Sequence, residues 1–386
     1  MQMGDAIIMT ERDNCPDFLS TGPDAPTGKF LRMFWQPVFE AARLKPGRAV
    51  PLRIMNEDFT LYRGQSGKPY LVDSRCAHRG AALSIGRVEG EHIACLYHGW
   101  TYDGGGQCVA QPSETRSFAS TVRVRAFTCR EYLGFVFAYL GAGEPPPFPL
   151  ILAAEGDGLL EARESRRPYP YFSQLENSVD EVHFNFTHRR STFTDVGLND
   201  SIPEVDSEES DYGLIRYGKR PGATRISHIL MPNCLYAKVH DELLGWTEHL
   251  SWRVPIDDET HSSFVAKKSS LVGAQVDAYK IKKEATRALL AGLEPADKVA
   301  DRVLSGEIHI DELPDRPDQV AIQDLVVLRS QGPRPRREKD LLGVSDRQIR
   351  LLRQIYTREL TAIAEGRATK QWRIPQDLKT STGLAD

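Results

Sequence analysis

Two short motifs, separated by sixteen residues, constrain this chain more than any other feature of its sequence. Cys76-Ala-His78 supplies one thiol and one imidazole, and Cys95-Leu-Tyr-His98 supplies a second pair. Proteins use two thiolates and two imidazoles for tetrahedral zinc, or for a [2Fe–2S] cluster with both cysteines on one iron and both histidines on the other. Because each motif contributes one ligand of each kind, we interpret them as two loops that enclose a two-iron cluster. A zinc site and a chance coincidence are the alternatives.

The residues that flank the two motifs fit a cluster that lies close to the backbone. Gly80, Gly99 and the run Gly104 to Gly106 allow tight turns and a close approach of the main chain. Backbone N–H groups in such turns can donate hydrogen bonds to sulfur and thereby tune the reduction potential.

Length and composition limit the classes of protein to which the chain can belong. The chain has 386 residues, which suits two domains better than one core. Its net charge of −4 argues against a nucleic-acid partner. The longest apolar run, Tyr132 to Leu140, is far shorter than the roughly 20 residues of a membrane-spanning helix, and the N-terminus has no signal-peptide core. We therefore expect a cytoplasmic protein without a membrane or nucleic-acid partner.

The first part of the chain predicts a small all-β domain. Short runs of β-branched and aromatic residues alternate with turn residues, and four prolines in the segment Gly141 to Pro149 mark a linker. Residues 1–145 thus form an N-terminal segment and a β domain with a core at about 35–140, and residues 146–386 form the second domain. The expected strands are Val50 to Ile54, Phe59 to Arg63, Pro69 to Asp73, His92 to Leu96, Thr121 to Thr128 and Phe135 to Tyr139.

The second part predicts helices around a set of strands. Residues 212–270 have strand patterns, which are strongest at Ser227 to Leu230, Leu235 to His240 and Leu250 to Val254. The expected helices are Gln174 to Arg189, Gln275 to Leu290, Asp318 to Ser330 and Asp346 to Ala364.

A second set of candidate ligands lies on the expected helix Gln174 to Arg189. Asn177, Asp180, His183 and His188 follow the pattern N-x2-D-x2-H-x4-H. The two histidines are five residues apart, about 140° around an ideal helix, so both reach one ion only if the helix distorts, as at a π-bulge, or ends between them. Two histidines and a carboxylate, with positions left open for O2, are the ligand set of Fe(II) oxygenases. Two histidines that merely decorate a helix are the alternative.

The third ligand of such a site must be a carboxylate from elsewhere in the chain. Asp324 lies in the otherwise apolar stretch Val320 to Leu328, where a carboxylate is costly unless it is paired or bound to metal. Asp318, at the start of the same expected helix, is the second candidate. A charge on the outer face of this helix is the alternative for Asp324.

These motifs resemble those of the Rieske non-haem iron ring-hydroxylating oxygenases. Cys-Ala-His-Arg-Gly and Cys-Leu-Tyr-His-Gly-Trp resemble the two halves of the Rieske box, and N-x2-D-x2-H-x4-H resembles the mononuclear iron motif. The segment Pro26 to Val38 is similar to the N-terminal segment of the phthalate dioxygenase-like branch. The resemblance implies an α+β chain: an all-β Rieske [2Fe–2S] domain, then a catalytic domain with a helix over an antiparallel sheet, a helix-grip or START-like fold.

The C-terminal signature of the family also has a counterpart here, with one departure. Gln323-Asp324, Gln331-Gly-Pro and Leu342-Gly-Val-Ser-Asp resemble it, and this alignment gives Asp324 the ligand position. Where the family usually has Asp-Arg this chain has Arg336-Arg337, and Asp340 replaces the usual Glu. The departure puts a local salt-bridge arrangement in doubt.

The resemblance also implies a role for each motif residue. Asp180 would bridge the two metal centres across subunits of a homotrimer or of stacked trimers, accepting the second-ring N–H of the neighbour's His98 and of His183. Its alternative is to orient His183 within one chain, and Asn177 accompanies it as a candidate catalytic residue. The implied ligands are Cys76, His78, Cys95 and His98 for the [2Fe–2S] cluster, and His183, His188 and Asp324 for the mononuclear Fe(II).

The implied activity is that of an oxygenase component, which uses O2 to dihydroxylate or hydroxylate a small aromatic substrate. The chain has no G-x-G-x-x-G fingerprint, so electrons would come from an NAD(P)H-dependent reductase with a flavin and a ferredoxin-type iron–sulfur centre. The branch favours an aromatic acid, whose carboxylate an arginine could hold. Arg220, Arg225 and His228 lie in the strand region that builds such pockets, although ordinary surface arginines are the alternative.

Two other functions stay open from the sequence. An O- or N-demethylating monooxygenase would have the same metals and motifs. A Rieske electron-transfer protein without oxygenase activity is an alternative of another class, and about two irons per chain rather than about three would distinguish it.

Overall fold

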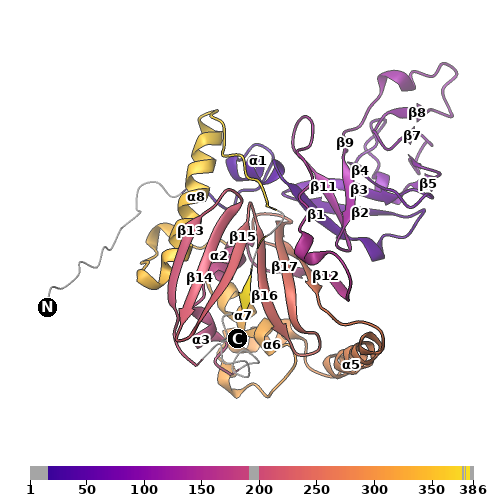
Figure 1. The fold of residues 1–386 in the computed structure, drawn as a ribbon. Coiled ribbons are helices and arrows are strands. Elements are labelled where there is room, and N and C mark those ends of the chain that lie inside the picture. The colour runs from indigo at the N-terminus through magenta and orange to yellow at the C-terminus, as the bar shows by residue number, and fades with distance from the viewer. Residues whose placement is uncertain (1–15, 191–199, 376–377, 379, 383–386) are drawn as a thin grey trace.

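Short strands separated by tight turns build the first domain, as the sequence pattern predicts (Figure 1). This computed structural model describes residues 16–190, 200–375, 378 and 380–382. One sheet, in the order β2-β3-β4-β9, comprises Ala49–Ile54, Glu57–Arg63, Pro69–Asp73 and Ala126–Phe127. A second, β5-β6-β7-β8, comprises Arg87–Glu89, His92–Ala94, Thr101–Tyr102 and Cys108–Ala110. A third, β1-β11-β10, comprises Trp35–Glu40, Phe135–Tyr139 and Cys129–Tyr132.

The expected strand Thr121 to Thr128 is wrong as a single element. A 3-10 turn occupies Ala119–Thr121, and only Ala126–Phe127 pairs as a strand, with β4. Between them Arg123 forms an isolated bridge with Gln107. The segment is extended but changes partner from one sheet to another, which its β-rich composition does not reveal.

The second domain is built on one large antiparallel sheet. Its strand order is β12-β18-β17-β16-β15-β14-β13, and the short strand β19 (Ser381–Thr382) pairs with β15. The strands are Leu160–Arg167, His261–Lys268, Gly245–Pro255, Cys234–Asp241, Ala223–Leu230, Gly213–Arg220 and Glu204–Glu209, in that order. This arrangement confirms the expected strands across residues 212–270.

Several helices lie along one end and one edge of this sheet (Figure 1). In this view α3, α6 and α7 lie at the lower end of the sheet and α8 at its left edge. The helices are α2 (Tyr171–Val179), α3 (His183–Thr187), α5 (Ala274–Ala291), α6 (Ala296–Leu304), α7 (Gln319–Ser330) and α8 (Arg347–Ala364). No helix in the described part of the chain is long and apolar enough to cross a membrane.

The single helix expected from Gln174 to Arg189 is wrong, because the structure divides it into α2 and α3. Asp180 ends α2 with an extended backbone (ψ 110°). A new helix then begins at His183 and ends at Thr187, so that His188 caps its C-terminal end. The two histidines therefore lie at the two ends of one short helix. Of the two arrangements that the five-residue spacing allows, the helix ends between the histidines and has no π-bulge.

The N-terminal segment packs on the second domain, although it precedes the first in sequence. Phe18 stacks on Phe172 of α2 with ring centroids 4.4 Å apart. Phe30, in helix α1 (Pro26–Arg32), contacts Tyr356 of α8 edge-on at 5.5 Å. One apolar core thus includes residues from both domains.

An ion-pair arrangement that the sequence puts in doubt is present beside α2 and α8. Buried Glu176 accepts hydrogen bonds from Arg337 at 2.8 Å and from Arg353 at 2.7 Å. Arg353 also donates to Asp340 at 2.6 Å, so the shorter acid at this position still reaches its partner.

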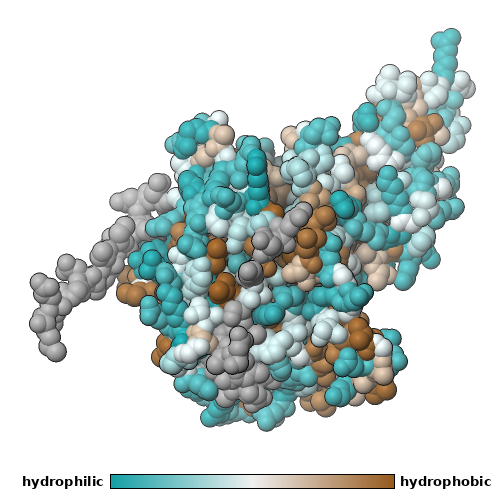
Figure 2. Space-filling view, viewed as in Figure 1, coloured by the Kyte–Doolittle hydropathy of each residue, from teal (hydrophilic) through white to brown (hydrophobic). Residues whose placement is uncertain are grey.

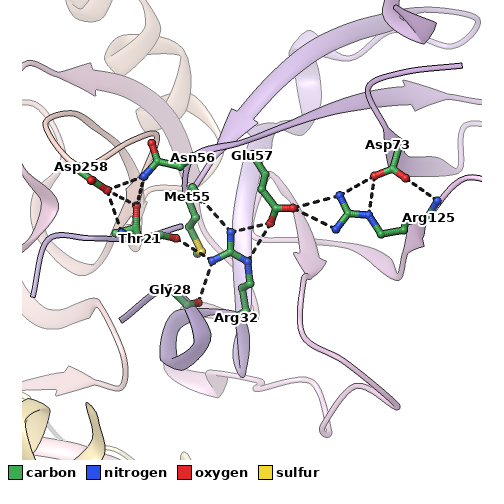
Figure 3. Close-up of polar contacts among 9 residues, drawn as sticks. All are labelled: Thr21, Gly28, Arg32, Met55, Asn56, Glu57, Asp73, Arg125 and Asp258. Carbon is green, nitrogen blue, oxygen red and sulfur yellow. Dashed lines mark hydrogen bonds and ion pairs between the residues drawn. The ribbon is translucent and has the colours of Figure 1, made fainter. Parts of the chain in front are cut away.

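A hairpin tip of the first domain is bonded directly to the second domain. The turn between β2 and β3 has positive φ at both Met55 and Asn56, as a two-residue type I′ turn requires. Their N–H groups donate to the carbonyls of Pro255 and Ile256 at 2.9 and 3.0 Å. Asn56 also donates to Asp258 at 2.6 Å (Figure 3).

Arg32 connects the N-terminal segment to this hairpin (Figure 3). Its buried guanidinium donates to the carbonyls of Thr21, Gly28 and Met55 at 2.9 to 3.0 Å. It also pairs with Glu57 at 2.8 Å, and Glu57 in turn accepts from Arg125. The N-terminal segment and the β2–β3 hairpin therefore share one buried cation.

We expect Arg32→Leu to lower the free energy of unfolding by about 3 kcal/mol, because it leaves three carbonyls and a carboxylate without their donor. Chemical denaturation measures this change. The control is Arg53→Gln, which breaks a pair with Asp58 of similar length, 2.8 Å, whose side chains are 42% and 55% exposed. Exposed pairs contribute little, so this control should change the free energy by less than about 0.5 kcal/mol. Equal effects of the two variants would contradict the central role of Arg32.

Candidate metal centres

The two cysteine–histidine loops have the same backbone hydrogen-bond pattern. In the first, the Gly80 N–H donates to the Cys76 carbonyl and the Cys76 N–H donates to Ala81, both at 2.9 Å. The second repeats this pattern at Cys95 and Gly99. Both glycines have a φ near 70°, a conformation that other residues adopt only with strain. The two cysteine–histidine loops therefore form matched turns.

The loops bring like ligands together. Cys76 and Cys95 are both 3% exposed, and the imidazole rings of His78 and His98 lie 4.6 Å apart. His78 also stacks on Trp100 at 4.5 Å. Its Nδ1 is buried and has no hydrogen-bond partner among the described residues, as expected of an atom that binds metal. A sulfur pair beside an imidazole pair fits a [2Fe–2S] cluster.

Tyr102 is a neighbour of this site that the motifs did not reveal. Its hydroxyl lies 3.2 Å from the Cys76 sulfur and accepts the Ala77 N–H at 3.1 Å. Hydrogen bonds to sulfur shift the potential of iron–sulfur clusters, so Tyr102 belongs to the electronic environment of the site.

A second group of ligands converges at the ends of α3. Within the described residues, one set of His, Cys, Asp and Glu side chains brings three ligand atoms within 4.8 Å of one another: His183, His188 and Asp324. His183 begins α3, His188 follows it, and Asp324 comes from the middle of α7. This is a two-histidine, one-carboxylate set that leaves coordination positions free, as non-haem Fe(II) requires. The four side chains Cys76, His78, Cys95 and His98 do not form such a compact set around one point. Their arrangement fits two iron ions better than one zinc ion.

Both imidazoles are oriented through their second nitrogen. Nδ1 of His183 donates to the main-chain carbonyl of Asp180 at 2.6 Å. Nδ1 of His188 donates to the side-chain oxygen of Gln323 at 2.8 Å. Each bond occupies Nδ1 and orients the ring so that Nε2 is the nitrogen available to bind a metal.

Asp324 and His188 stabilise each other's charge. The Asp324 carboxylate lies 3.2 Å from Nε2 of His188 and also accepts from Asn177 at 3.4 Å. Burial would raise the pKa of Asp324, but its hydrogen bond and charge interaction with His188 outweigh burial and lower it. Burial would likewise lower the pKa of His188, and Asp324 raises it instead. The lowered pKa of Asp324 favours its ionised form, which is the form in which a carboxylate binds a metal ion.

Comparisons with known proteins show the family to which the chain belongs. A family model described as Rieske [2Fe-2S] domain matches residues 34–128. The chain is 28% identical to the 5,5'-dehydrodivanillate O-demethylase oxygenase subunit of Sphingobium sp. (strain NBRC 103272 / SYK-6), over 90% of this chain and 80% of that protein. It is 30% identical to the phenoxybenzoate dioxygenase subunit alpha of Ectopseudomonas oleovorans, over 67% of this chain and 69% of that protein. The chain belongs to the Rieske non-haem iron oxygenases.

A solved structure extends this likeness to the fold of both domains. The terminal oxygenase of carbazole 1,9a-dioxygenase from Novosphingobium sp. KA1 matches with a TM-score of 0.62 at 20% identity, over 86% of this chain and 94% of that one. The expected α+β architecture, a Rieske domain followed by a catalytic domain with a large antiparallel sheet, is confirmed.

Family membership decides between the alternatives left open by the sequence. This Rieske oxygenase carries a [2Fe–2S] cluster and a mononuclear non-haem iron, and it depends on a separate electron-donor protein. A zinc-binding module and an electron carrier without oxygenase activity are therefore excluded.

The Asp180 carboxylate does not contact the His183 ring as the resemblance implies. Its Oδ1 instead accepts the backbone N–H groups of Val182 at 2.9 Å and of His183 at 3.2 Å. The ring is bonded to the main-chain carbonyl of the same residue. The reason is the helix break, which folds the carboxylate back over the start of α3, where free N–H groups need acceptors.

The second candidate for the third ligand is already engaged elsewhere. Asp318 precedes α7 and forms a two-point ion pair with Arg316, at 2.5 and 3.0 Å. Its carboxylate is thereby neutralised by an arginine, whereas Asp324 faces the two histidines.

The three candidate substrate residues of this Rieske oxygenase do not lie together. Arg220 and Arg225 converge on the buried carboxylate of Glu181, at 3.1 and 3.3 Å. His228 is also buried but contacts Tyr212 at 3.1 Å. It is three residues from Arg225 on β15, and side chains three apart on a strand point to opposite faces. Arg225 and His228 therefore lie on opposite faces of the sheet, as strand alternation alone could have indicated.

Proposed function

We propose that this oxygenase component holds its mononuclear iron with His183, His188 and Asp324. The observation that carries the proposal is the convergence of these three ligand atoms, with both imidazoles oriented by bonds at Nδ1. For the cluster we propose Cys76, His78, Cys95 and His98. We also propose that the boundary between the two domains lies at residues 145–146, because β11 ends at Tyr139 and β12 begins at Leu160.

We further propose that electrons cross between subunits of a homotrimer or of stacked trimers. In one chain, the sheet that carries the cluster loops and the helices α3 and α7 lie at opposite ends of the molecule (Figure 1). Segment 294–318, which adjoins α3, has eight acidic and three basic residues. The surface around the cluster loops has the opposite charge, with exposed Arg75, Arg79, Arg87, Arg116 and Arg123.

Exposed apolar side chains support assembly as well. Figure 2 shows a mostly hydrophilic face with apolar side chains gathered over α5. Ile281 and Leu289 in this helix are 73% and 54% exposed, and Tyr97 beside the cluster ligand His98 is 57% exposed. Such side chains are costly in water and are typical of contact surfaces. Light scattering at several protein concentrations would test whether the chain assembles.

Within that assembly, Asp180 is proposed as the residue that touches both centres. Its main-chain carbonyl accepts from the ring of His183, and one carboxylate oxygen stays available beyond the two backbone bonds. That oxygen would accept the free N–H of His98 of the neighbouring subunit. Asn177 accompanies it by orienting Asp324.

For the substrate we propose a small aromatic acid that is dihydroxylated or hydroxylated. One relative is named for phenoxybenzoate, and the sheet face that carries Arg225 also carries Arg253. Arg253 is 5% exposed, its Nε has no partner among the described residues, and its charge interacts with that of Asp324. A substrate carboxylate would supply the missing acceptor. Arg253 is therefore a better candidate for this contact than Arg225, which Glu181 already binds.

O-demethylation is the second candidate activity. The relative that matches 90% of this chain is named as an O-demethylase oxygenase subunit. An aromatic acid with a methoxy group would satisfy both proposals about the substrate, because the acid group and the reacting group are different parts of the molecule.

In this mechanism the protein supplies orientation and charge. The cluster held by Cys76, His78, Cys95 and His98 would supply single electrons, and the iron held by His183, His188 and Asp324 would supply the centre for O2 chemistry. Gln323 and the Asp180 carbonyl hold the protons on Nδ1 of the two imidazoles, so that Nε2 of each is directed to one point. Arg253 would hold the substrate carboxylate away from that point. Electrons would arrive from an NAD(P)H-dependent reductase with a flavin and a ferredoxin-type centre.

A single-turnover assay tests the proposed activity. The protein is chemically reduced, mixed with ¹⁸O2 and offered benzoates, phenoxybenzoates and methoxybenzoates, and the products are analysed by mass spectrometry. Two labelled oxygens in a diol would establish dioxygenation. One labelled oxygen, or loss of a methyl group, would establish hydroxylation or demethylation. Turnover of neutral aromatics alone would overturn the aromatic-acid proposal.

A further inference from the structure

The buried carboxylate of Glu181 connects the break between α2 and α3 to the sheet. Glu181 is 1% exposed, although it lies in the connection between two helices. It is paired with Arg220 at 3.1 Å and Arg225 at 3.3 Å, and Arg216 lies 3.5 Å away. These arginines come from the neighbouring strands β14 and β15. Three cations on one carboxylate are more than a single ion pair needs.

The sheet is shaped to admit this side chain. Gly218 lies on β14 between the positions of Arg216 and Arg220, on the same face of the strand. A Cβ atom at this glycine would lie 2.7 Å from Cγ of Glu181. Any larger residue would therefore push the carboxylate out of its contact with the arginines.

The contact of Glu181 with the arginines affects its neighbours in the chain, because Glu181 lies between the two helices. The residue before it, Asp180, ends α2, and the residue after it, Val182, precedes α3. The Asp180 carboxylate accepts the N–H groups of Val182 and His183, and its carbonyl accepts the His183 ring. Because the backbone of three consecutive residues is covalently coupled, anchoring the middle one fixes the direction of both neighbours.

We propose that Glu181, held by Arg216, Arg220 and Arg225, is a positioning residue that sets the α2–α3 break and thereby aligns Asp180 and His183. The proposal rests on the proposed roles of those two residues. Glu181 itself binds neither metal nor substrate. It acts on electron transfer through the backbone geometry of its neighbours.

The chain contains a matched control for this proposal. Glu176 is also a buried carboxylate, lies five residues earlier within α2, and is held by Arg337 and Arg353. Its arginines do not connect it to the α2–α3 break. Glu181→Gln and Glu176→Gln remove the same charge and keep the same shape, so they separate a local positioning effect from a general loss of stability.

The first readout is hydrogen exchange of the purified holoenzyme, followed by mass spectrometry on peptides that cover residues 180–188. We expect Glu181→Gln to speed exchange at the Val182 and His183 amides at least tenfold, and Glu176→Gln to change it less than twofold. The second is single-turnover stopped flow. Glu181→Gln should slow reoxidation of the reduced cluster at least tenfold with an unchanged cluster spectrum, whereas Glu176→Gln should stay within twofold of the wild type.

Each outcome bears on the proposal. Wild-type exchange and reoxidation in Glu181→Gln would overturn it, as would equal effects of the two variants. If Glu181→Gln does not fold, Arg220→Gln removes one of the three cations and should show the same pattern more weakly; no effect there would also overturn it. Asp180→Asn separates the two proposals: if it reoxidises normally, the bridge fails, and if it is slow while Glu181→Gln is normal, only the positioning role fails.

Discussion

Replacing Asp324 with alanine is expected to remove the mononuclear iron and leave the [2Fe–2S] cluster in place. The carboxylate faces His188 at 3.2 Å and is one of three ligand atoms that converge within 4.8 Å. Two imidazoles alone bind Fe(II) weakly, because the charge and one coordination bond are lost. Iron analysis should fall from about three to about two per chain, and oxygenation should cease. The visible spectrum of the cluster should be unchanged, because its ligands lie in the other domain.

The matched control is Asp318→Ala, six residues earlier at the start of the same helix. Asp318 pairs with Arg316, so its removal should weaken a local ion pair and leave iron content unchanged. If Asp324→Ala retains a full complement of mononuclear iron, the assignment of the third ligand is wrong. Iron loss in Asp318→Ala alone would move the ligand to that residue.

Asp180→Asn is expected to keep both metals and lose about 99% of turnover, since partners of metal ligands commonly contribute up to about 100-fold in activity. The asparagine oxygen can still accept the N–H groups of Val182 and His183, and the carbonyl that accepts the His183 ring is unaffected. What changes is the charge and one oxygen, which becomes an NH2 donor and repels the N–H of a neighbouring imidazole. Stopped-flow reoxidation of the reduced cluster should therefore slow by a similar factor.

The control for this variant is Asp277→Asn, which removes the same charge from α5, where the side chain is 76% exposed. It should leave iron content and turnover unchanged. Normal reoxidation in Asp180→Asn would refute the bridge, and loss of mononuclear iron would mean that Asp180 instead orients His183 within its own chain.

The cluster site could be predicted from sequence because it is local. Each loop contains its own cysteine, histidine and turn glycine within five residues, so the spacing alone determines the geometry. The strands within residues 212–270 and the helices α5, α7 and α8 were also predicted, because their residue patterns have the period of the element they form. The sheet strands β12 and β13 and the helix α6 were not predicted. Asp324 could be selected since an acid in an apolar stretch needs a partner.

The arrangement around the second centre could not be predicted in the same way. The helix pattern continues through Asp180, and the residues that break it are arginines 35 to 44 positions later, which hold Glu181. Gln323 could have been suspected only with the knowledge that His188 faces it. Non-local contacts of this kind override local propensity, and motif spacing does not record them. The placement of Arg225 and His228 on opposite faces is different, because strand alternation alone could have indicated it.

The hairpin tip at Met55 and Asn56 has a consequence for how the enzyme responds to dilution. Its main-chain bonds to Pro255 and Ile256 keep the Rieske domain from swinging toward the iron of its own chain. If the electron crosses only between subunits, a dissociated chain is inactive even with both metals bound. Specific activity should then fall steeply below the association concentration. Mixing a cluster-free Cys76→Ser chain with an iron-free Asp324→Ala chain should restore activity that neither has alone.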